Sequence, residues 1–216
     1  MNSTAILAKG SKLEIGTATG SANAVTAIGL SNPCRVTLES SIADLRVGDV
    51  VTLAGIVGTT QLNGNNYVVQ YLEPGNKVIT LAGVDATGFT PFESGGTLTP
   101  VSLTRIANLL SYSGFDGEAE EVDVTHMEST AHEVMLGLPN EGSFTMEFDY
   151  NAADSGQIAL KAAKNSGAKK SFKLTCPDGS TATFAAFVKK FSKSGDVKGV
   201  QKGSCTLRIT GTVIDS

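Results

Sequence analysis

The sequence predicts a mainly β protein: an antiparallel sheet core with one packed α-helix, and an inserted small all-β, barrel-like domain. Three observations support this class. The 216 residues include 24 glycines and no tryptophan, many short apolar runs are separated by turn signals, and three later segments alternate between apolar and polar residues. The chain is long enough to bury one large core or two small ones.

Residues 21–102 are predicted to form a compact β unit without a helix. Turn signals at 63–65, 74–76 and 95–96 separate short apolar runs, a spacing typical of a small barrel or sandwich. The runs are Val36–Leu38, Val50–Leu53, Tyr67–Val69 and Val78–Leu81. Because this unit supplies its own core, we expect it to be inserted into a second domain. That domain consists of residues 1–20, with one strand near 12–15 and a loop-like stretch at 16–24, and of residues 103–216.

The second domain is predicted to contain strands with one buried face. Phe144, Met146, Phe148 and Tyr150 alternate with polar residues, which is the period of a strand with one buried face. The same alternation occurs at Phe172, Leu174 and Cys176, and at Cys205, Leu207 and Ile209.

One helix is predicted between these strands, at 155–166. Asp154 or Ser155 can cap its N-terminus and Gly167 suits its C-terminus. Its apolar stripe is predicted to consist of Ile158, Ala159, Ala162 and Ala163.

Charge is divided unevenly along the second domain. Residues 116–154 contain eleven acidic residues and no lysine or arginine, whereas residues 155–210 contain eleven basic residues and only two acidic ones, Asp178 and Asp196. Two interpretations stay open. The segments lie side by side and neutralise each other within one fold, or the acidic surface of one subunit meets the basic surface of the next.

Signatures of catalysis, metal binding and cofactor binding are absent from the sequence, so we expect no enzyme, no cofactor and no metal. There is no nucleophile elbow and no phosphate-binding loop. His126 and His132 are six residues apart, a spacing that matches neither a helical metal pair nor a zinc finger. The three cysteines are scattered and are predicted to be buried, apolar side chains in a reducing cytoplasm rather than a disulfide framework or a metal site. The acidic overall composition argues against tight DNA binding, and no apolar run is long enough to span a membrane.

Several segments resemble the tail tube proteins of long-tailed bacteriophages (siphophages). The segments are GEAEEVDVTHMES (117–129), TAHEVMLGLPNEG (130–142), Asp149-Tyr150-Asn151 with Gln157, LRITGTV (207–213) and KGSKLEIG (9–16). They occur in order, over about 130 residues, on both sides of residues 21–102. Within those residues, GDVVTLAG (48–55), QLNG (61–64) and Gly95-Gly96 resemble a small β module of phage structural proteins.

The resemblance implies a fold of two packed antiparallel sheets, a sandwich or half-barrel, with one flanking α-helix. It also implies a structural virion protein that polymerises as stacked, hexameric rings into a tail tube through which viral DNA passes. It implies assembly in the host bacterial cytoplasm with a tape measure protein, a tail-tip initiator and a tail terminator. It offers no catalytic residues, and it implies that the inserted unit decorates the outside of the tube. Two alternatives stay open: a single-ring connector or terminator, and an adhesion or carbohydrate-binding module that uses residues 21–102.

Candidate contact residues follow from these expectations. Residues 128–141 are expected to form a long loop that docks on an adjacent subunit or ring. Glu147 and Asp149, on the polar face of a strand, are the candidates for the lumen, where carboxylates would repel DNA; an intersubunit salt bridge is the alternative. The interface candidates are Glu118, Glu120, Glu121, Asp123, His126, Glu128, Met135, Leu136, Leu138, Lys189 and Lys190.

Overall fold

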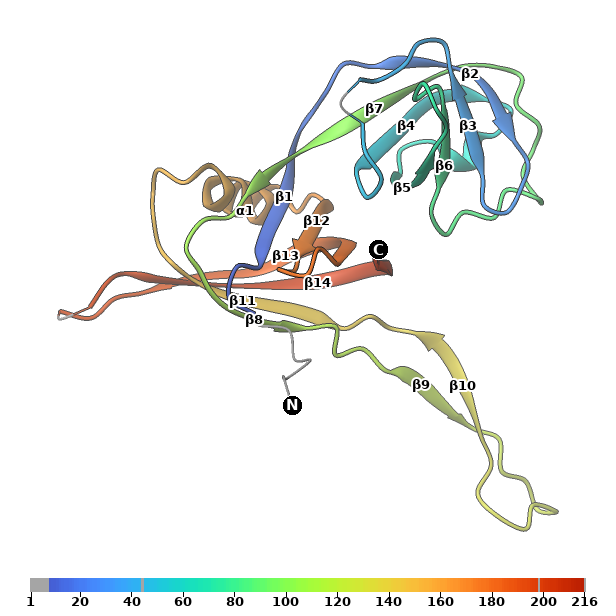
Figure 1. Cartoon of the computed structure of the whole chain (residues 1–216). Coiled ribbons are helices and arrows are strands. Elements are labelled where there is room, and N and C mark those ends of the chain that lie inside the picture. Colours follow the sequence, from blue (N-terminus) through green and yellow to red (C-terminus); the bar gives the residue numbers. More distant parts are fainter. Residues whose placement is uncertain (1–7, 44, 198, 216) are drawn as a thin grey trace, which may run out of the picture. The chain divides into compact units, whose positions relative to one another are not determined.

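The protein is described by a computed structural model that places residues 8–215 except 44 and 198, and it is largely antiparallel β structure with one α-helix (Figure 1). The predicted fold class is therefore confirmed. The described residues divide into two compact units. Unit 1 holds the residues up to 105, residues 171–183 and those from 214 on, and unit 2 holds residues 106–170 and 184–213.

Unit 1 contains a closed six-stranded barrel. Its strands follow the order β2-β3-β6-β5-β4-β7, and pairing of Asn23 with Leu98 and of Ala24 with Thr97 closes β2 onto β7. A single apolar core made of residues between Val25 and Leu98 fills the barrel. The strands are β2 (Asn23–Gly29), β3 (Arg35–Leu38), β4 (Val50–Val57), β5 (Asn66–Leu72), β6 (Val78–Leu81) and β7 (Ser94–Arg105).

The strands that lead into and out of the barrel lie side by side. β1 (Lys12–Thr19) pairs with the far end of β7, and the Gly20 amide donates a hydrogen bond to the Pro100 carbonyl at 2.7 Å. On its other side β1 pairs with β12 (Lys170–Thr175). The predicted insertion at 21–102 lies wholly in unit 1, which also contains β1 and most of β12, and its boundaries stay a prediction.

Unit 2 is built on a sheet with the strand order β13-β14-β11-β8. Apolar side chains gather on one face of the sheet, where the Phe144 ring lies between the rings of Tyr112 and Phe184. As predicted, Phe144, Met146 and Phe148 are buried, and so are Cys205, Leu207 and Ile209. The strands are β8 (Leu109–Gly114), β11 (Ser143–Asp149), β13 (Thr181–Ser194) and β14 (Lys202–Asp215).

The helix α1 has the predicted bounds, Ser155–Ser166. The Asp154 side chain accepts a hydrogen bond from the Gln157 amide at its start, and Gly167 ends it in the left-handed conformation at φ 64°. The predicted apolar stripe is correct at Ala163 and wrong at Ile158 and Ala162, which are exposed. The buried face is Gly156, Gln157, Leu160 and Ala163.

Gln157 explains this rotation of the helix. Its side-chain amide donates to the carbonyls of Ala107 and Asp149 and accepts from the Asn151 amide. A polar side chain with satisfied hydrogen bonds can therefore occupy a face that a hydrophobicity pattern assigns to apolar residues.

Three other predictions differ from the structure. Residues 128–141 are not one loop, since they contain the strand β10 (Val134–Pro139), which pairs with β9 (Ala119–Asp123). The loop expected at 16–24 is shorter than predicted, because β1 extends to Thr19 and β2 begins at Asn23. The region predicted to lack helices contains one turn of 3-10 helix, η1 (Thr60–Leu62).

The cysteines of the described chain form no disulfide. All three cysteines are free; Cys34 and Cys205 are buried and Cys176 is partly exposed. Burial raises the pKa of the Cys34 thiol to about 11 and that of Cys205 to about 12, so both remain protonated thiols near neutral pH. Within the described part of the chain, no helix is long and apolar enough to cross a membrane.

Gly203 offers a test of the packing in unit 2. It lies opposite Phe148 in the sheet, and a methyl group there would overlap the Phe148 ring. We expect Gly203→Ala to lower the free energy of unfolding by about 1–3 kcal/mol, as overpacking does. Gly195→Ala is the control, because its added carbon would make only an ordinary 3.6 Å contact with Gln201. Equal denaturant midpoints for the two variants would contradict this packing.

Candidate assembly surfaces

A two-stranded β arm extends from unit 2. We define the arm as residues 118–140, which comprise β9, β10 and the turn between them; the strands pair in register from Val134 opposite Asp123 to Leu136 opposite Glu121. Figure 1 shows the arm projecting beyond the end of the sheet. The arm holds nine of the eleven residues predicted as interface candidates: Glu118, Glu120, Glu121, Asp123, His126, Glu128, Met135, Leu136 and Leu138.

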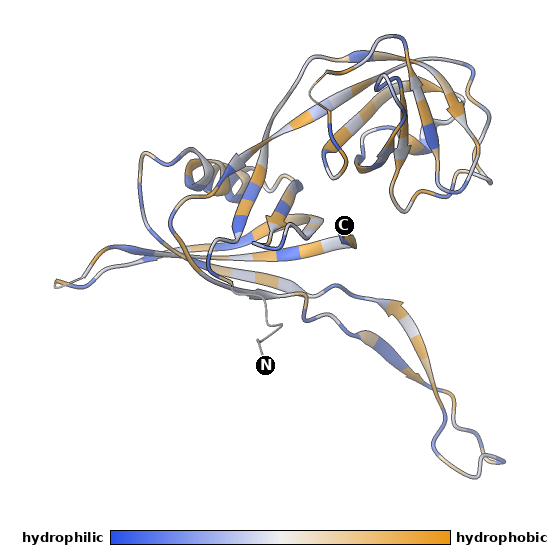
Figure 2. Cartoon of the chain, in the orientation of Figure 1, coloured by the Kyte–Doolittle hydropathy of each residue, from blue (hydrophilic) through white to orange (hydrophobic). Residues whose placement is uncertain are grey.

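The arm exposes an unusual amount of apolar surface. Every residue of β10 is exposed, and Leu136 and Leu138 retain 70% and 89% of their accessible area. Figure 2 shows the contrast between the largely hydrophobic β10 and the largely hydrophilic β9. An isolated two-stranded hairpin is at best marginally stable in water, and clustered exposed apolar residues mark interaction surfaces. The arm therefore has the character of a segment that another molecule covers.

Hydrogen bonds to Asp116 fix the root of the arm. The Asp116 carboxylate accepts from the Ser143 amide at 2.8 Å and from the Ser143 hydroxyl. These bonds, with the nearby positive charge of Arg208, hold the pKa of Asp116 below its usual range. Arg208 also donates to the Asn140 side chain and to the Gly142 carbonyl. The chain leaving β10 is thus tied to the sheet, and the arm projects from a fixed base.

The turn of the arm is organised by its own side chains. The Thr125 hydroxyl lies 3.0 Å from His132 Nδ1 and accepts from the Glu133 amide, while the His126 carbonyl accepts from the Ser129 amide. The Asp123 carboxylate accepts from Thr125, and this hydrogen bonding lowers its pKa. Both histidines therefore take part in hydrogen bonds of the turn, and both remain exposed.

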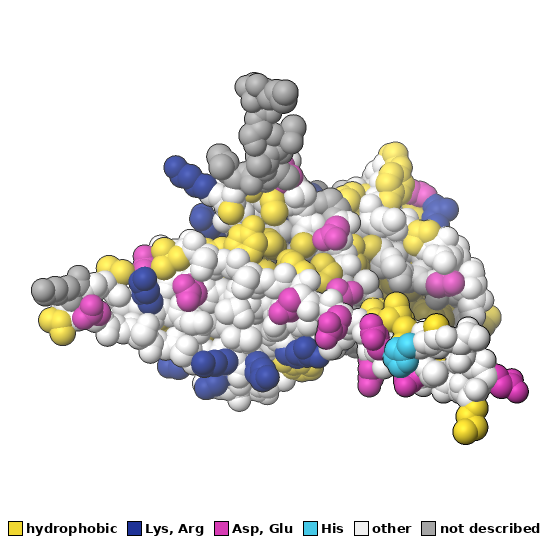
Figure 3. Space-filling model, turned by 90° about the horizontal axis from the view of Figure 1, so that it is seen from below, with side chains coloured by type: hydrophobic (Ala, Val, Ile, Leu, Met, Phe, Trp, Pro, Cys, Tyr) yellow, Lys and Arg dark blue, Asp and Glu magenta, His cyan; other side chains and the backbone are white. Residues whose placement is uncertain are grey.

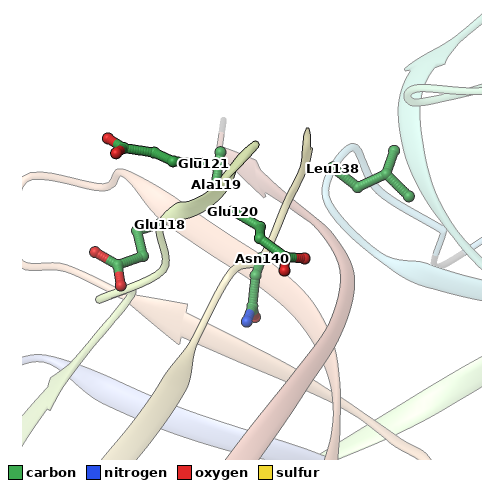
Figure 4. Close-up of a pocket in the computed structure, with 6 residues that line it drawn as sticks. All are labelled: Glu118, Ala119, Glu120, Glu121, Leu138 and Asn140. Atoms are coloured by element: carbon green, nitrogen blue, oxygen red, sulfur yellow. The ribbon is translucent and has the colours of Figure 1, made fainter. Parts of the chain in front are cut away.

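An open hollow of about 670 Å³ lies at the base of the arm, lined by Glu118, Ala119, Glu120, Glu121, Leu138 and Asn140. Figure 4 shows Glu118 and Glu121 pointing away from Leu138. Among the residues that the structure describes, no group of three or more His, Cys, Asp or Glu side chains could hold a metal ion. The chemistry of this hollow, carboxylates beside an exposed leucine, suits a basic and apolar protein surface.

The second candidate surface is the polar face of the unit 2 sheet. On this face Glu147 lies between Ser111 on β8 and Ser204 on β14, and Thr145 lies between Ser113 and Thr206. The Ser111 hydroxyl donates to the Glu147 carboxylate at 3.4 Å. We call these six residues the polar face. They form a grid of five hydroxyl groups around one exposed carboxylate, and Asp149, opposite Lys202, lies beyond it on the same strand.

Lys189 and Lys190 lie on β13, away from the arm. Both are exposed although they are consecutive, whereas Val188 is buried and the Phe191 ring lies 5.8 Å from the Phe148 ring. The alternation of buried and exposed residues therefore does not continue past Val188. Together with Phe187, which is 41% exposed, they make this part of β13 basic and partly apolar.

The opposite charges of unit 2 are not joined in salt bridges within the described residues. Within the described ranges, no salt bridge joins an acidic residue of 116–154 to a lysine or arginine of 155–210. Figure 3 shows lysine and arginine side chains gathered along one edge of the visible face, and acidic side chains around the histidine of the arm. Direct ion pairing within one chain therefore does not account for the asymmetry.

Sequence reasoning missed two features of these surfaces. One is the set of hydroxyl residues on β8 and β14, because serine and threonine at alternate positions give no hydrophobic signal. The other is that β8 ends the strand order and that the six-residue β12 can pair with only part of the fourteen-residue β13. β8 contains neither a charged residue nor a proline that would block pairing with another strand.

A family model described as phage tail tube protein, TTP, matches residues 57–213, well over half of the chain. Three solved structures contain chains similar to this one. One chain in the virion of a native gene transfer agent particle is 20% identical, with TM-score 0.45, covering 58% of this chain and 88% of that chain. One in the tail of an empty gene transfer agent particle, with C6 symmetry, is 21% identical, with TM-score 0.44 and coverages of 62% and 92%. One in the six-fold symmetrised anti-feeding prophage baseplate is 10% identical, with TM-score 0.43 and coverages of 82% and 97%. No curated protein matches the chain.

The anchoring of the arm can be tested through Asp116. We expect Asp116→Ala to increase hydrogen exchange at the Ser143 amide, because that amide loses its acceptor. The folded pKa of Asp116 is lowered. Protection of the Ser143 amide from exchange in the unaltered protein should therefore be complete at pH values above the usual aspartate pKa, and it should be lost as the pH falls through the lowered pKa. Asp85→Ala removes similar hydrogen bonds, from the Thr87 amide and hydroxyl to a carboxylate, in unit 1. It is the control, and it should leave exchange at the Ser143 amide unchanged. Unaltered exchange at Ser143 in Asp116→Ala would contradict this anchoring.

Proposed function

The chain belongs to the phage tail tube protein family and has a structural role in a tail tube, and we propose that it builds this tube by polymerising as stacked, hexameric rings. The single observation that carries the proposal is the arm, an acidic and apolar hairpin that its own chain leaves uncovered. A second copy is the partner that a polymer always supplies. The role is non-enzymatic and needs no cofactor.

Ring closure is supported by two strand segments of the unit 2 sheet that can pair with another chain. A ring needs a heterologous contact, in which one surface of a subunit meets a different surface of its neighbour. β8 ends the strand order, and the six-residue β12 can pair with only part of the fourteen-residue β13, so both segments can offer backbone groups to a neighbouring strand. Lys189 and Lys190 lie in the second half of β13 and would take part in this contact.

The polar face is proposed to line the lumen, with Glu147 and Asp149 as its carboxylates. DNA must slide through the tube without binding, and clustered lysines would instead hold phosphates. Hydroxyl groups carry no charge, and the two carboxylates repel a polyanion. Both residues must therefore face the channel in an assembled ring, and a ring that placed them on the outer wall would reject the assignment.

The barrel of unit 1 is proposed to be an outward decoration that is not needed for assembly. Its core is self-contained, and its connecting strands are hydrogen bonded to each other at Gly20 and Pro100. Tape measure, tail-tip initiator and tail terminator proteins are the further partners that we propose, with passage of double-stranded DNA and assembly in the host bacterial cytoplasm.

Electron microscopy of the purified, concentrated protein tests the proposal. We expect hollow tubes of stacked rings. Single closed rings would instead indicate a connector or terminator, and cell or glycan binding through the barrel would favour an adhesion module. If the protein remains monomeric even with a tail-tip complex as initiator, the tube function is wrong.

The contribution of the arm is tested by Leu136→Asp. Leu136 is largely exposed, so the monomer should keep its melting temperature, while tubes should be lost because a charge replaces an apolar contact. Val47→Asp is the matched control, since Val47 is a half-exposed apolar residue of the barrel, and it should still form tubes. Normal tubes from Leu136→Asp would show that the arm is not a contact.

The decorative role of the barrel is tested by deletion of residues 21–99, which joins Gly20 directly to Pro100 beside their present hydrogen bond. We expect the shortened chain to form tubes of smaller outer diameter and unchanged lumen. A folded, monomeric deletion variant that forms no tubes would contradict the decorative role.

A further inference from the structure

The arm and a second exposed hairpin lie at opposite ends of the unit 2 sheet. The register pairs Ser143 with Arg208 at the end where the arm begins, and Asp149 with Lys202 at the other end. There β13 and β14 continue into a turn; we call residues 189–202 the tip hairpin, leaving aside residue 198, which is not described. Six residues of strand separate the two ends, roughly 20 Å at about 3.3 Å per residue. Figure 1 shows the two hairpins extending in opposite directions.

The arm is strongly acidic. It contains six carboxylates and no lysine or arginine, and its carboxylates flank the exposed Leu136 and Leu138. The carboxylates are Glu118, Glu120, Glu121, Asp123, Glu128 and Glu133.

The tip hairpin has the complementary character. Its described lysines are Lys193 and Lys202, with Lys189 and Lys190 of the proposed ring contact at its base, against one acidic residue, Asp196. Val197 is fully exposed and Val200 is 63% exposed. Lys193 is held over the Tyr150 ring at 3.6 Å, which fixes one of these cations in position. Like the arm, the tip hairpin places exposed apolar side chains beside charges, and none of its described lysines joins an acidic residue in a salt bridge.

We propose that the tip hairpin of one subunit is the docking site for the arm of a second copy in the next ring. This inference rests on the proposed function of stacked rings. Rings that stack in one direction bring one end of each subunit against the opposite end of the next, so a surface at the arm end must match a surface at the tip end. The opposite charges and the shared exposed apolar residues supply that match.

Docking within one chain is excluded by the same geometry. The arm and the tip hairpin leave opposite ends of the paired segment that runs from Ser143 opposite Arg208 to Asp149 opposite Lys202. A contact between them therefore requires two copies and propagates without closing, as an axial polymer requires. Its charged component should weaken as salt rises, because both surfaces are exposed.

A charge-reversal experiment tests the pairing. One variant carries Glu120→Lys and Glu121→Lys in the arm, a second carries Lys193→Glu and Lys202→Glu in the tip hairpin, and a third combines all four. We expect each of the first two to form closed rings with at least tenfold fewer tubes by electron microscopy, and the combined variant to regain tubes. Arg46→Glu with Lys77→Glu, on the barrel, is the control and should form tubes normally. Normal tubes from the tip variant, or failure of the combined variant to regain what the others lose, would overturn the pairing.

Cysteine cross-linking gives a second readout that does not need tubes. A Leu136→Cys protein mixed with a Val200→Cys protein under mild oxidation should give a disulfide-linked dimer, at least tenfold above either protein alone or Leu136→Cys mixed with Val47→Cys. Linkage of Leu136→Cys to itself, or none to Val200→Cys, would overturn the pairing. If the unaltered protein forms no tubes but this link forms, the stacked-ring function fails while the contact stands.

Discussion

The antiparallel pairing of β11 between β8 and β14 is the constraint on which the functional surfaces depend. Because successive side chains of a strand point to opposite faces, burying Phe144, Met146 and Phe148 forces Thr145 and Glu147 to the other face. The neighbouring strands place Ser111, Ser113, Ser204 and Thr206 in the same rows. A slip of one residue would turn every one of these groups into the core, so one register fixes both the core and the proposed channel lining.

Several surfaces of the same sheet are left exposed in the single chain. Within the described residues β8 is paired on one side only, the arm is an exposed hairpin with apolar side chains, and the opposite charges are not joined in salt bridges. Exposed strand edges and apolar side chains promote aggregation of a monomer, but they can form the subunit contacts of a polymer. The barrel differs, since its core is self-contained and its sheet closes on itself.

Much of this fold could be predicted because its local signals agree. The Asp154 cap and Gly167 bounded α1, and strict alternation identified β11 and β14. The arm could not be recognised as a hairpin, since β10 is exposed on both faces and its pattern carries no burial period. The face of α1 was misjudged because hydrogen bonds, not hydrophobicity, bury Gln157. The residues of the arm could be selected from the sequence because their charge and apolar character are visible in it. The polar face and the tip hairpin could not, because they depend on strand register and topology, which the sequence does not show.

The most direct test of the central claim is a cryo-electron microscopy map of the assembled protein in which β11 can be traced. We predict a hollow tube whose channel is lined by the polar face, with Glu147 directed into the lumen and the apolar face of the sheet packed within the wall. A map that placed Glu147 on the outer surface, with another part of the chain lining the channel, would contradict the account.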